Sequence, residues 1–153
     1  MPKYEYLSHD EMNSYYAEAV RQMAVEEFKP AVVIAPMRGG ADFGVKVSNY
    51  FNIPFIPLQW QTRDGTEQDR AALADIFRKY DGQNILFVDD ICDSGETLKG
   101  IERASNYSRN NIRFAVAIEN IESGFPCDYT AREISRTEDT QWFIFPWEDW
   151  WKR

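Results

Sequence analysis

The segment ILFVDDICDSGETL, residues 85–98, carries the pattern that decides the expected fold. Four consecutive apolar residues lead directly into Asp89 and Asp90, which is typical of a strand buried on both faces. A turn containing Gly95 follows, and the residues from about Glu96 to Tyr107 are expected to form a helix. A buried strand that passes through a short turn into a helix predicts one unit of an α/β domain.

Comparable signals occur on both sides of this segment. Apolar residues recur at helical spacing over residues 8–28, and either Ser8 or Asp10 can cap that helix. Pro54 and Pro57 favour a sheet edge for the strand that contains them. The alternation predicts a mainly parallel, twisted sheet flanked by helices, with ligands beyond the carboxyl ends of the strands. The other expected elements are a helix from Gly39 and Gly40 toward residue 50 and strands at residues 31–36, 53–59 and 112–119.

Length and composition narrow the class of protein. A chain of 153 residues suits one domain, which we expect to span residues 1–153. The net charge of -8, with no cluster of Lys and Arg, argues against nucleic-acid binding. The sequence contains no apolar run long enough for a membrane span and no signal peptide, so a cytoplasmic location is expected. Cys92 and Cys127 are expected to be reduced, and the single histidine, His9, excludes a zinc cluster.

The turn after the buried strand combines groups that suit a sugar phosphate. The hydroxyls of Ser94 and Thr97, the backbone amides near Gly95 and the positive end of the following helix form a good monophosphate pocket. Asp89 and Asp90 would repel that phosphate unless they served other atoms, such as ribose hydroxyls and a hard cation. Capping of a helix needs one side chain and does not explain five ordered polar residues.

This turn resembles the phosphoribosyl pyrophosphate signature of the type I phosphoribosyltransferases. The resemblance implies that Asp90 holds Mg²⁺, that Asp89 binds the ribose hydroxyls, and that Asp93 binds N7 of a purine and assists proton transfer. These three acids are the predicted catalytic residues. The implied binding residues for phosphoribosyl pyrophosphate in this turn are Asp89, Asp90, Ile91, Cys92, Asp93, Ser94, Gly95, Glu96 and Thr97.

Two further segments resemble diphosphate-binding parts of the same family. In APMRGGADFG, residues 35–44, Arg38 and Gly39 match the pyrophosphate loop, where glycine lets backbone amides approach the diphosphate and arginine supplies a charged fork. Residues 60–70 are polar and have no hydrophobic period, which predicts a mobile loop over the substrate. The resemblance places Arg70 as the cation of this loop, with Arg63 as the alternative.

The C-terminal segment TEDTQWFIFPWEDWW, residues 137–151, resembles the short aromatic hood of the xanthine-guanine and hypoxanthine enzymes. By this resemblance Trp142 stacks on the purine, and backbone carbonyls near Phe143 meet groups at the purine 2-position. Stacking suits any purine and adds affinity before specificity. Trp150 and Trp151 are expected to pack against the sheet or a neighbouring subunit, which agrees with a homodimer or homotetramer.

The family resemblance implies transfer of a phosphoribosyl group to guanine, xanthine or hypoxanthine. One departure affects the choice of base, because Asn120 stands at or near the position where enzymes for 6-oxopurines place a lysine. An asparagine can donate or accept a hydrogen bond, so it could serve a 6-oxo or a 6-amino group. The alternatives are therefore a transferase for adenine, diaminopurine or another amino-substituted base, and a non-catalytic nucleotide-sensing regulator of the same fold.

Overall fold

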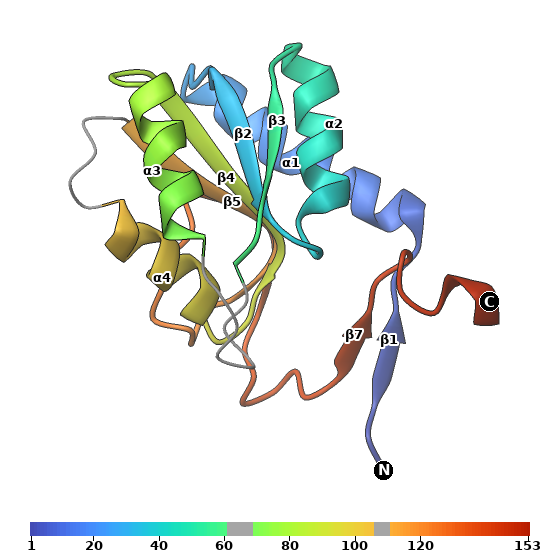
Figure 1. The fold of residues 1–153 in the computed structure, drawn as a ribbon. Coiled ribbons are helices and arrows are strands. Elements are labelled where there is room, and N and C mark those ends of the chain that lie inside the picture. The colour runs from blue at the N-terminus through green and yellow to red at the C-terminus, as the bar shows by residue number, and fades with distance from the viewer. Residues whose placement is uncertain (61–68, 106–110) are drawn as a thin grey trace.

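The computed structural model of the protein describes residues 1–60, 69–105 and 111–153 (Figure 1). Its chain alternates strands and helices for most of its length. In order along the chain the elements are β1 (Tyr4–Tyr6), α1 (His9–Val25), β2 (Val32–Pro36), α2 (Ala41–Phe51), β3 (Phe55–Leu58), α3 (Arg70–Lys79), β4 (Asn84–Cys92), α4 (Glu96–Ala104), β5 (Asn111–Asn120), β6 (Tyr129–Ile134), β7 (Trp142–Ile144) and a 3₁₀ turn (Trp150–Lys152).

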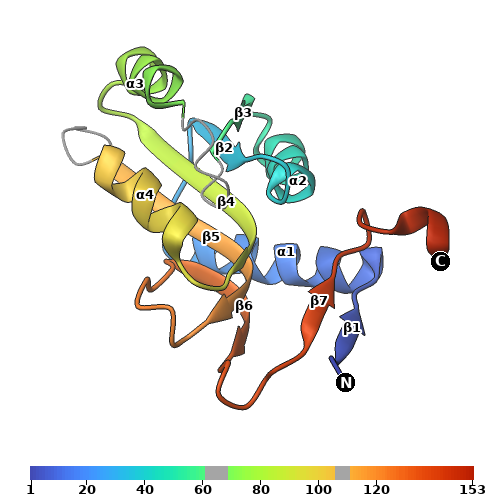
Figure 2. The same ribbon diagram turned by 60° about the horizontal axis from the view of Figure 1, so that its bottom comes forward.

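The main sheet has five strands in the order β3-β2-β4-β5-β6, and every neighbouring pair is parallel. Successive side chains of a strand point to opposite faces of the sheet. The apolar residues of the central strand β4 therefore contribute to a core on each face. Ile85 and Phe87 join the core beneath α3 and α4, whereas Leu86 and Val88 join the core beneath α1 and α2. The helices accordingly lie as two pairs on opposite faces (Figure 2).

A second, two-stranded sheet pairs β1 with β7, also in parallel. It brings the N-terminal and C-terminal segments of the chain together, and β7 lies between β1 and the main sheet in both ribbon views (Figures 1 and 2). A fork from Arg132 on β6 to the carboxylate of Glu5 on β1 ties this ribbon to the main sheet. Gln141 donates to the same carboxylate at 3.2 Å. We call residues 137–151 the hood.

Most expected elements are present. The α/β class with a parallel sheet flanked by helices is confirmed, Ser8 caps α1 through a complete capping box, and β3 lies at a sheet edge. Four elements were not predicted, namely β1, α3, β6 and the 3₁₀ turn. None of the helices in the described part of the chain is long and apolar enough to cross a membrane.

The expectation of a mobile loop from residue 60 to residue 70 is wrong at both ends. Trp60 is only 2% exposed and packs in the core beneath α3 and α4. Arg70 is the first residue of α3, which Asp69 caps by accepting a hydrogen bond from the backbone amide of Ala72. Residues 61–68, which include Arg63, and Tyr107, the expected end of α4, lie outside the described residues.

Candidate functional site

The predicted site residues follow strands whose carboxyl ends meet at one edge of the main sheet. Ile34 of β2 lies beside Phe87 of β4, so the Arg38 loop after β2 comes next to the acids at the end of β4. A Cβ atom added to Gly39 would lie 2.7 Å from Oδ2 of Asp90. The backbone at Gly39 therefore contacts the Asp90 carboxylate directly, as close approach of a glycine backbone allows.

Asp89 and Asp90 are two adjacent carboxylates in an enclosed position. Asp89 is 9% exposed, and its Oδ1 accepts a hydrogen bond of 2.9 Å from the Asp90 amide. Burial and the neighbouring Asp90 carboxylate raise the pKa of Asp89 above its usual range. Burial raises the pKa of Asp90 to about 6, and the carboxylate of Glu148 in the hood adds to this rise. Within residues 1–60, 69–105 and 111–153, none of the ion pairs involves either carboxylate.

The acid pair fits a divalent cation. Ionised carboxylates are the ligands that Mg²⁺ prefers, and Mg²⁺ is commonly held by one or two of them together with substrate phosphates. No three acid, His or Cys side chains gather to form a metal site within the described ranges. Asp90 is the member that is both partly exposed and next to the Gly39 backbone. These observations support the predicted assignment of Asp90 to the metal.

The turn that leads into α4 has the features of a phosphate cradle. Gly95 has a φ of 82°, a backbone conformation that favours glycine, and it serves as the N-cap without a side-chain hydrogen bond. Ser94 Oγ accepts from the Glu96 amide at 3.3 Å, and Thr97 lies half-buried one residue further along. The next amides of this first turn have no acceptor within the helix and are available to an anion.

Ile91 and Cys92 are also among the binding residues that the resemblance implies, and both pack into the cores next to this turn. Ile91 packs against the core beneath α1 and α2, while Cys92 is buried in the opposite core. The Cys92 thiol lies 3.7 Å from Ser123 Oγ and 3.9 Å from the Phe125 carbonyl oxygen. Glu96 is exposed at the helix start. Of these three residues, none presents a buried polar side chain to the cradle.

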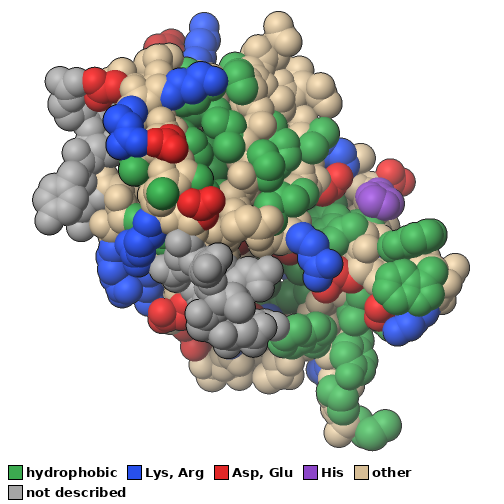
Figure 3. All heavy atoms as spheres, viewed as in Figure 1, with side chains coloured by type: hydrophobic (Ala, Val, Ile, Leu, Met, Phe, Trp, Pro, Cys, Tyr) green, Lys and Arg blue, Asp and Glu red, His purple; other side chains and the backbone are tan. Residues whose placement is uncertain are grey.

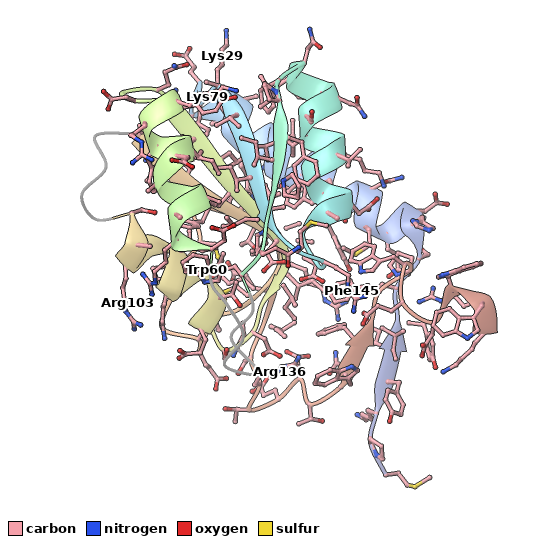
Figure 4. All side chains as sticks on the ribbon, in the orientation of Figure 1. Lys29, Trp60, Lys79, Arg103, Arg136 and Phe145 are labelled. Atoms are coloured by element: carbon pink, nitrogen blue, oxygen red, sulfur yellow. The ribbon has the colours of Figure 1, made fainter. Side chains whose placement is uncertain are left out.

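Asp93 lies just beyond β4 and is forked by an arginine that the sequence did not reveal. Its Oδ1 and Oδ2 accept from Nε and NH2 of Arg136, each at 2.9 Å. Arg136 follows β6, and Figure 4 shows it between the main sheet and β7. No sequence signal marked this residue, because β6 was not predicted and the arginine follows an ordinary polar segment.

Asn120, at the end of β5, was predicted to contact the purine. Its Nδ2 donates to the Asp93 carbonyl oxygen at 2.9 Å, and its Oδ1 accepts from the amides of Glu122 at 3.1 Å and Arg136 at 3.4 Å. The residue is only 6% exposed. Both ends of its amide make hydrogen bonds to the backbone, which hold Asp93 and Arg136 in place. One N–H of Nδ2 remains, and the contact of Asn120 with a base stays a prediction.

The hood presents an open strand edge to this site. Trp142 donates to the Lys3 carbonyl and Leu7 donates to the Ile144 carbonyl, at 2.8 and 2.9 Å. In a parallel pair alternate residues bond to the partner strand, so the N–H and C=O of Phe143 point away from β1. β7 pairs with no strand but β1 within the described residues, and its other edge faces the main sheet (Figure 1).

The two predicted hood residues differ in exposure. The Phe143 ring is buried, with the guanidinium carbons of Arg132 and Arg136 at 5.1 and 5.3 Å from its centroid. Trp142 is 49% exposed. Figure 3 shows hydrophobic side chains gathered where β1, the hood and the C-terminal turn meet. The exposed aromatic residues of this region are Tyr4, Tyr6, Trp142, Trp150 and Trp151.

The predicted loop cation lies at the start of α3. The guanidinium carbon of Arg70 is 5.5 Å from the centroid of the Trp60 ring. The first residue of α3 therefore lies close to a residue that follows shortly after β3. Figure 4 shows Trp60 beneath α3. The role of Arg70 at the diphosphate stays a prediction.

Comparison with known proteins finds phosphoribosyltransferases both by sequence and by structure. Residues 5–149 match the phosphoribosyl transferase domain. The chain is 30% identical over 134 residues to a xanthine-guanine phosphoribosyltransferase of Idiomarina loihiensis, covering 85% of this chain and 77% of the relative.

Two solved structures share the fold. A purine phosphoribosyltransferase of Pyrococcus horikoshii superposes with a TM-score of 0.69 at 21% identity, over 96% of this chain and 95% of the other. A xanthine-guanine-hypoxanthine phosphoribosyltransferase of Helicobacter pylori superposes with a TM-score of 0.74 at 16% identity, over 99% and 97%. Identities at this level show a common fold.

The raised pKa of Asp89 predicts a stability cost at neutral pH. A carboxyl whose folded pKa exceeds its unfolded value binds more protons when folded, so the free energy of unfolding falls as pH rises from about 4 through the folded pKa. Asp89→Asn removes the buried charge and should raise the free energy of unfolding of the metal-free protein at pH 8, with little change near pH 4. Urea unfolding at both pH values measures this difference, and Glu102→Gln, at an exposed position of α4, is the control. Equal stability of Asp89→Asn and wild type at pH 8 would contradict the account.

Gly39→Ala should perturb the acid pair through its new Cβ atom. That atom would lie within 3.0 Å of both carboxylate oxygens of Asp90, so the Asp90 side chain must move. We expect binding of phosphoribosyl pyrophosphate with Mg²⁺ to weaken by roughly tenfold or more, because the displaced Asp90 carboxylate no longer holds its position beside the Arg38 loop. Isothermal titration calorimetry gives the affinity, and wild-type affinity in the variant would show that Gly39 is not part of the site.

Proposed function

The chain belongs to the phosphoribosyl transferase family, and from this premise we propose that it transfers the 5-phosphoribosyl group of phosphoribosyl pyrophosphate to a purine base, with release of pyrophosphate. Guanine, xanthine and hypoxanthine are the proposed bases. The observation that carries the proposal is the meeting of three features at one sheet edge: the acid pair of β4, the helix start at Gly95, and the glycine backbone of the Arg38 loop. Each suits one part of the activated sugar.

The phosphate groups are proposed to bind at the two glycine turns. The amides and hydroxyls of Ser94 to Thr97 bind the 5-phosphate, whose charge is stabilised by the N-terminus of α4. Arg38 and the Gly39 amide bind the diphosphate, and Arg70 contributes a second cation from the start of α3. Positive groups around the diphosphate stabilise the charge that develops as it leaves C1 of the ribose.

The acid pair is proposed to bind the sugar and its cation. Asp89 accepts hydrogen bonds from the ribose hydroxyls, and Asp90 binds Mg²⁺ in its ionised form. Mg²⁺ held by Asp90 would supply positive charge that stabilises the leaving diphosphate. Proximity of Gly39 keeps the Asp90 carboxylate aligned with the diphosphate loop.

The base is proposed to lie between Asp93 and the hood. Trp142 stacks on the purine face, and the Phe143 backbone presents an N–H and a C=O toward its 2-position. As the C1–N9 bond forms and the bond from C1 to the diphosphate breaks, the proton on N7 passes to the Asp93 carboxylate. Asn120 holds the backbone of Asp93 in position for this step.

The net charge and the exposed aromatic residues bear on the location and the assembly of the protein. We propose a cytoplasmic enzyme that does not bind nucleic acid, in agreement with the net charge of -8. The exposed aromatic residues of β1, the hood and the C-terminal turn support assembly as a homodimer or homotetramer. Light scattering after size-exclusion chromatography determines which assembly forms.

A base panel tests the proposed activity. The protein is incubated with phosphoribosyl pyrophosphate, Mg²⁺ and, in turn, guanine, xanthine, hypoxanthine, adenine and diaminopurine, and released pyrophosphate is measured. Release with the three 6-oxopurines supports the proposal. Preference for adenine or diaminopurine would favour a transferase for amino-substituted bases, and binding of nucleotides without release from any base would favour a nucleotide-sensing regulator.

Trp142→Ala should separate base binding from sugar binding. Loss of a stacking ring is expected to weaken base binding by roughly 10-fold, while the affinity for phosphoribosyl pyrophosphate changes little because Trp142 is remote from the acid pair in sequence and lies in the hood. Titration calorimetry with each ligand provides both values. Trp151→Ala, which removes another exposed tryptophan, is the matched control and should leave both affinities unchanged. Equal weakening of both ligands by Trp142→Ala would contradict a stacking role.

A further inference from the structure

Arg136 is a fixed cation beside the proposed catalytic acid. Its guanidinium forks the Asp93 carboxylate through Nε and NH2, and its NH1 donates to the carbonyl oxygens of Asp139 at 2.9 Å and Gln141 at 2.6 Å. The side chain is 23% exposed. These four hydrogen bonds fix the plane of the guanidinium, and one N–H of NH2 remains for a further acceptor in the described part of the chain.

Asp93 and Arg136 together present an acceptor and a donor side by side. Oδ2 of Asp93 and NH2 of Arg136 are 2.9 Å apart, and the Asp93 side chain is 41% exposed, so both atoms can face a ligand. A carboxylate oxygen keeps a further lone pair when it accepts one hydrogen bond from the guanidinium. The pair therefore matches a ligand edge that has one donor and one acceptor on adjacent atoms.

We propose that Arg136 is a specificity-determining residue that selects purines with a 6-oxo group, an inference that rests on the proposed function. The N7 edge of such a base, protonated on N7, has an N–H donor next to the exocyclic oxygen acceptor. Asp93 accepts from N7 while NH2 of Arg136 donates to the oxygen. A 6-amino group would instead place a donor against the Arg136 donor, which leaves a charged group without its partner.

The neighbouring polar groups do not offer the same contact. The amide of Asn120 is committed to the backbone at three places, as described above. The ammonium of Lys99 donates to the Ser123 carbonyl oxygen at 2.9 Å. Arg136 is thus the cation that the described structure holds against Asp93.

The test compares two bases that differ only at the 6-position, hypoxanthine and unsubstituted purine. In wild type we expect kcat/KM to be about 10- to 100-fold higher for hypoxanthine, which is the range for a hydrogen bond to a charged group. In Arg136→Met, which keeps a long side chain but no donor, this ratio should fall close to one. A role of Arg136 in holding the hood alone would lower both rates by the same factor and leave the ratio unchanged, and that result would overturn the inference.

Arg132→Met is the matched control. Arg132 also lies over the Phe143 ring and also forks a carboxylate, that of Glu5, but it makes no contact with Asp93. Its loss should lower turnover with both bases while the hypoxanthine-to-purine ratio stays at the wild-type value. A ratio that collapses equally in Arg132→Met would show that the selectivity follows from the hood as a whole, and it would overturn the assignment to Arg136.

A measurement on wild type keeps the inference testable if Arg136→Met does not fold. The expected order of kcat/KM is hypoxanthine, then purine, then adenine, because adenine adds a donor that faces Arg136. Adenine at or above hypoxanthine would overturn the inference while leaving phosphoribosyl transfer intact. Absence of pyrophosphate release with every base would instead refute the proposed function.

Discussion

Two adjacent carboxylates at the end of the central strand impose the constraint on which the site depends. Charged groups in an enclosed position are unfavourable unless they gain a partner, and burial raises the pKa of both Asp89 and Asp90. The cores on the two faces of the sheet hold β4 rigidly enough to keep them there. In the function proposed above, a cation and the sugar hydroxyls are the partners that this arrangement gains.

Parallel strand order converts this local feature into a composite site. The carboxyl ends of β2, β4 and β5 lie at one edge, so the Gly39 backbone, the acid pair and Asn120 approach one another although they are far apart in the chain. The hood is then tied to the same edge through Arg136, which contacts the signature turn, the segment before β7 and the Phe143 ring. One side chain thereby joins the hood to the turn that follows β4.

The sequence predicted those parts of the molecule that have a strong local signal. The apolar run of β4, the glycine turns and the aromatic tail each occupy a few consecutive residues, and the structure places them at one end of the sheet. The helix α3 was overlooked although Leu73, Ile76 and Tyr80 are spaced for one buried face. The polar residues before α3 were interpreted as a loop that began at Trp60. The burial of Trp60 was therefore not predicted.

The other features that the sequence did not predict depend on contacts between distant parts of the chain. β1 has three residues and forms a strand because β7, from the other end of the chain, pairs with it. The edge strand β6 mixes buried and half-buried positions and lacks a clear period. The position of Arg136 also depends on long-range contacts, because its partners lie in the turn after β4 and in the hood. Its contact with Asp93 exists only after the sheet has formed, and no spacing within the chain encodes it.

Calorimetric titration of the unmodified protein with phosphoribosyl pyrophosphate, with and without Mg²⁺, tests the central claim most directly. We predict one site per chain, with an affinity that rises by roughly tenfold or more when Mg²⁺ is present, because the cation neutralises both the acid pair and the diphosphate. Failure to bind in either condition, or an affinity that does not respond to Mg²⁺, would contradict the assignment of the β4 carboxylates to a metal-bound sugar phosphate.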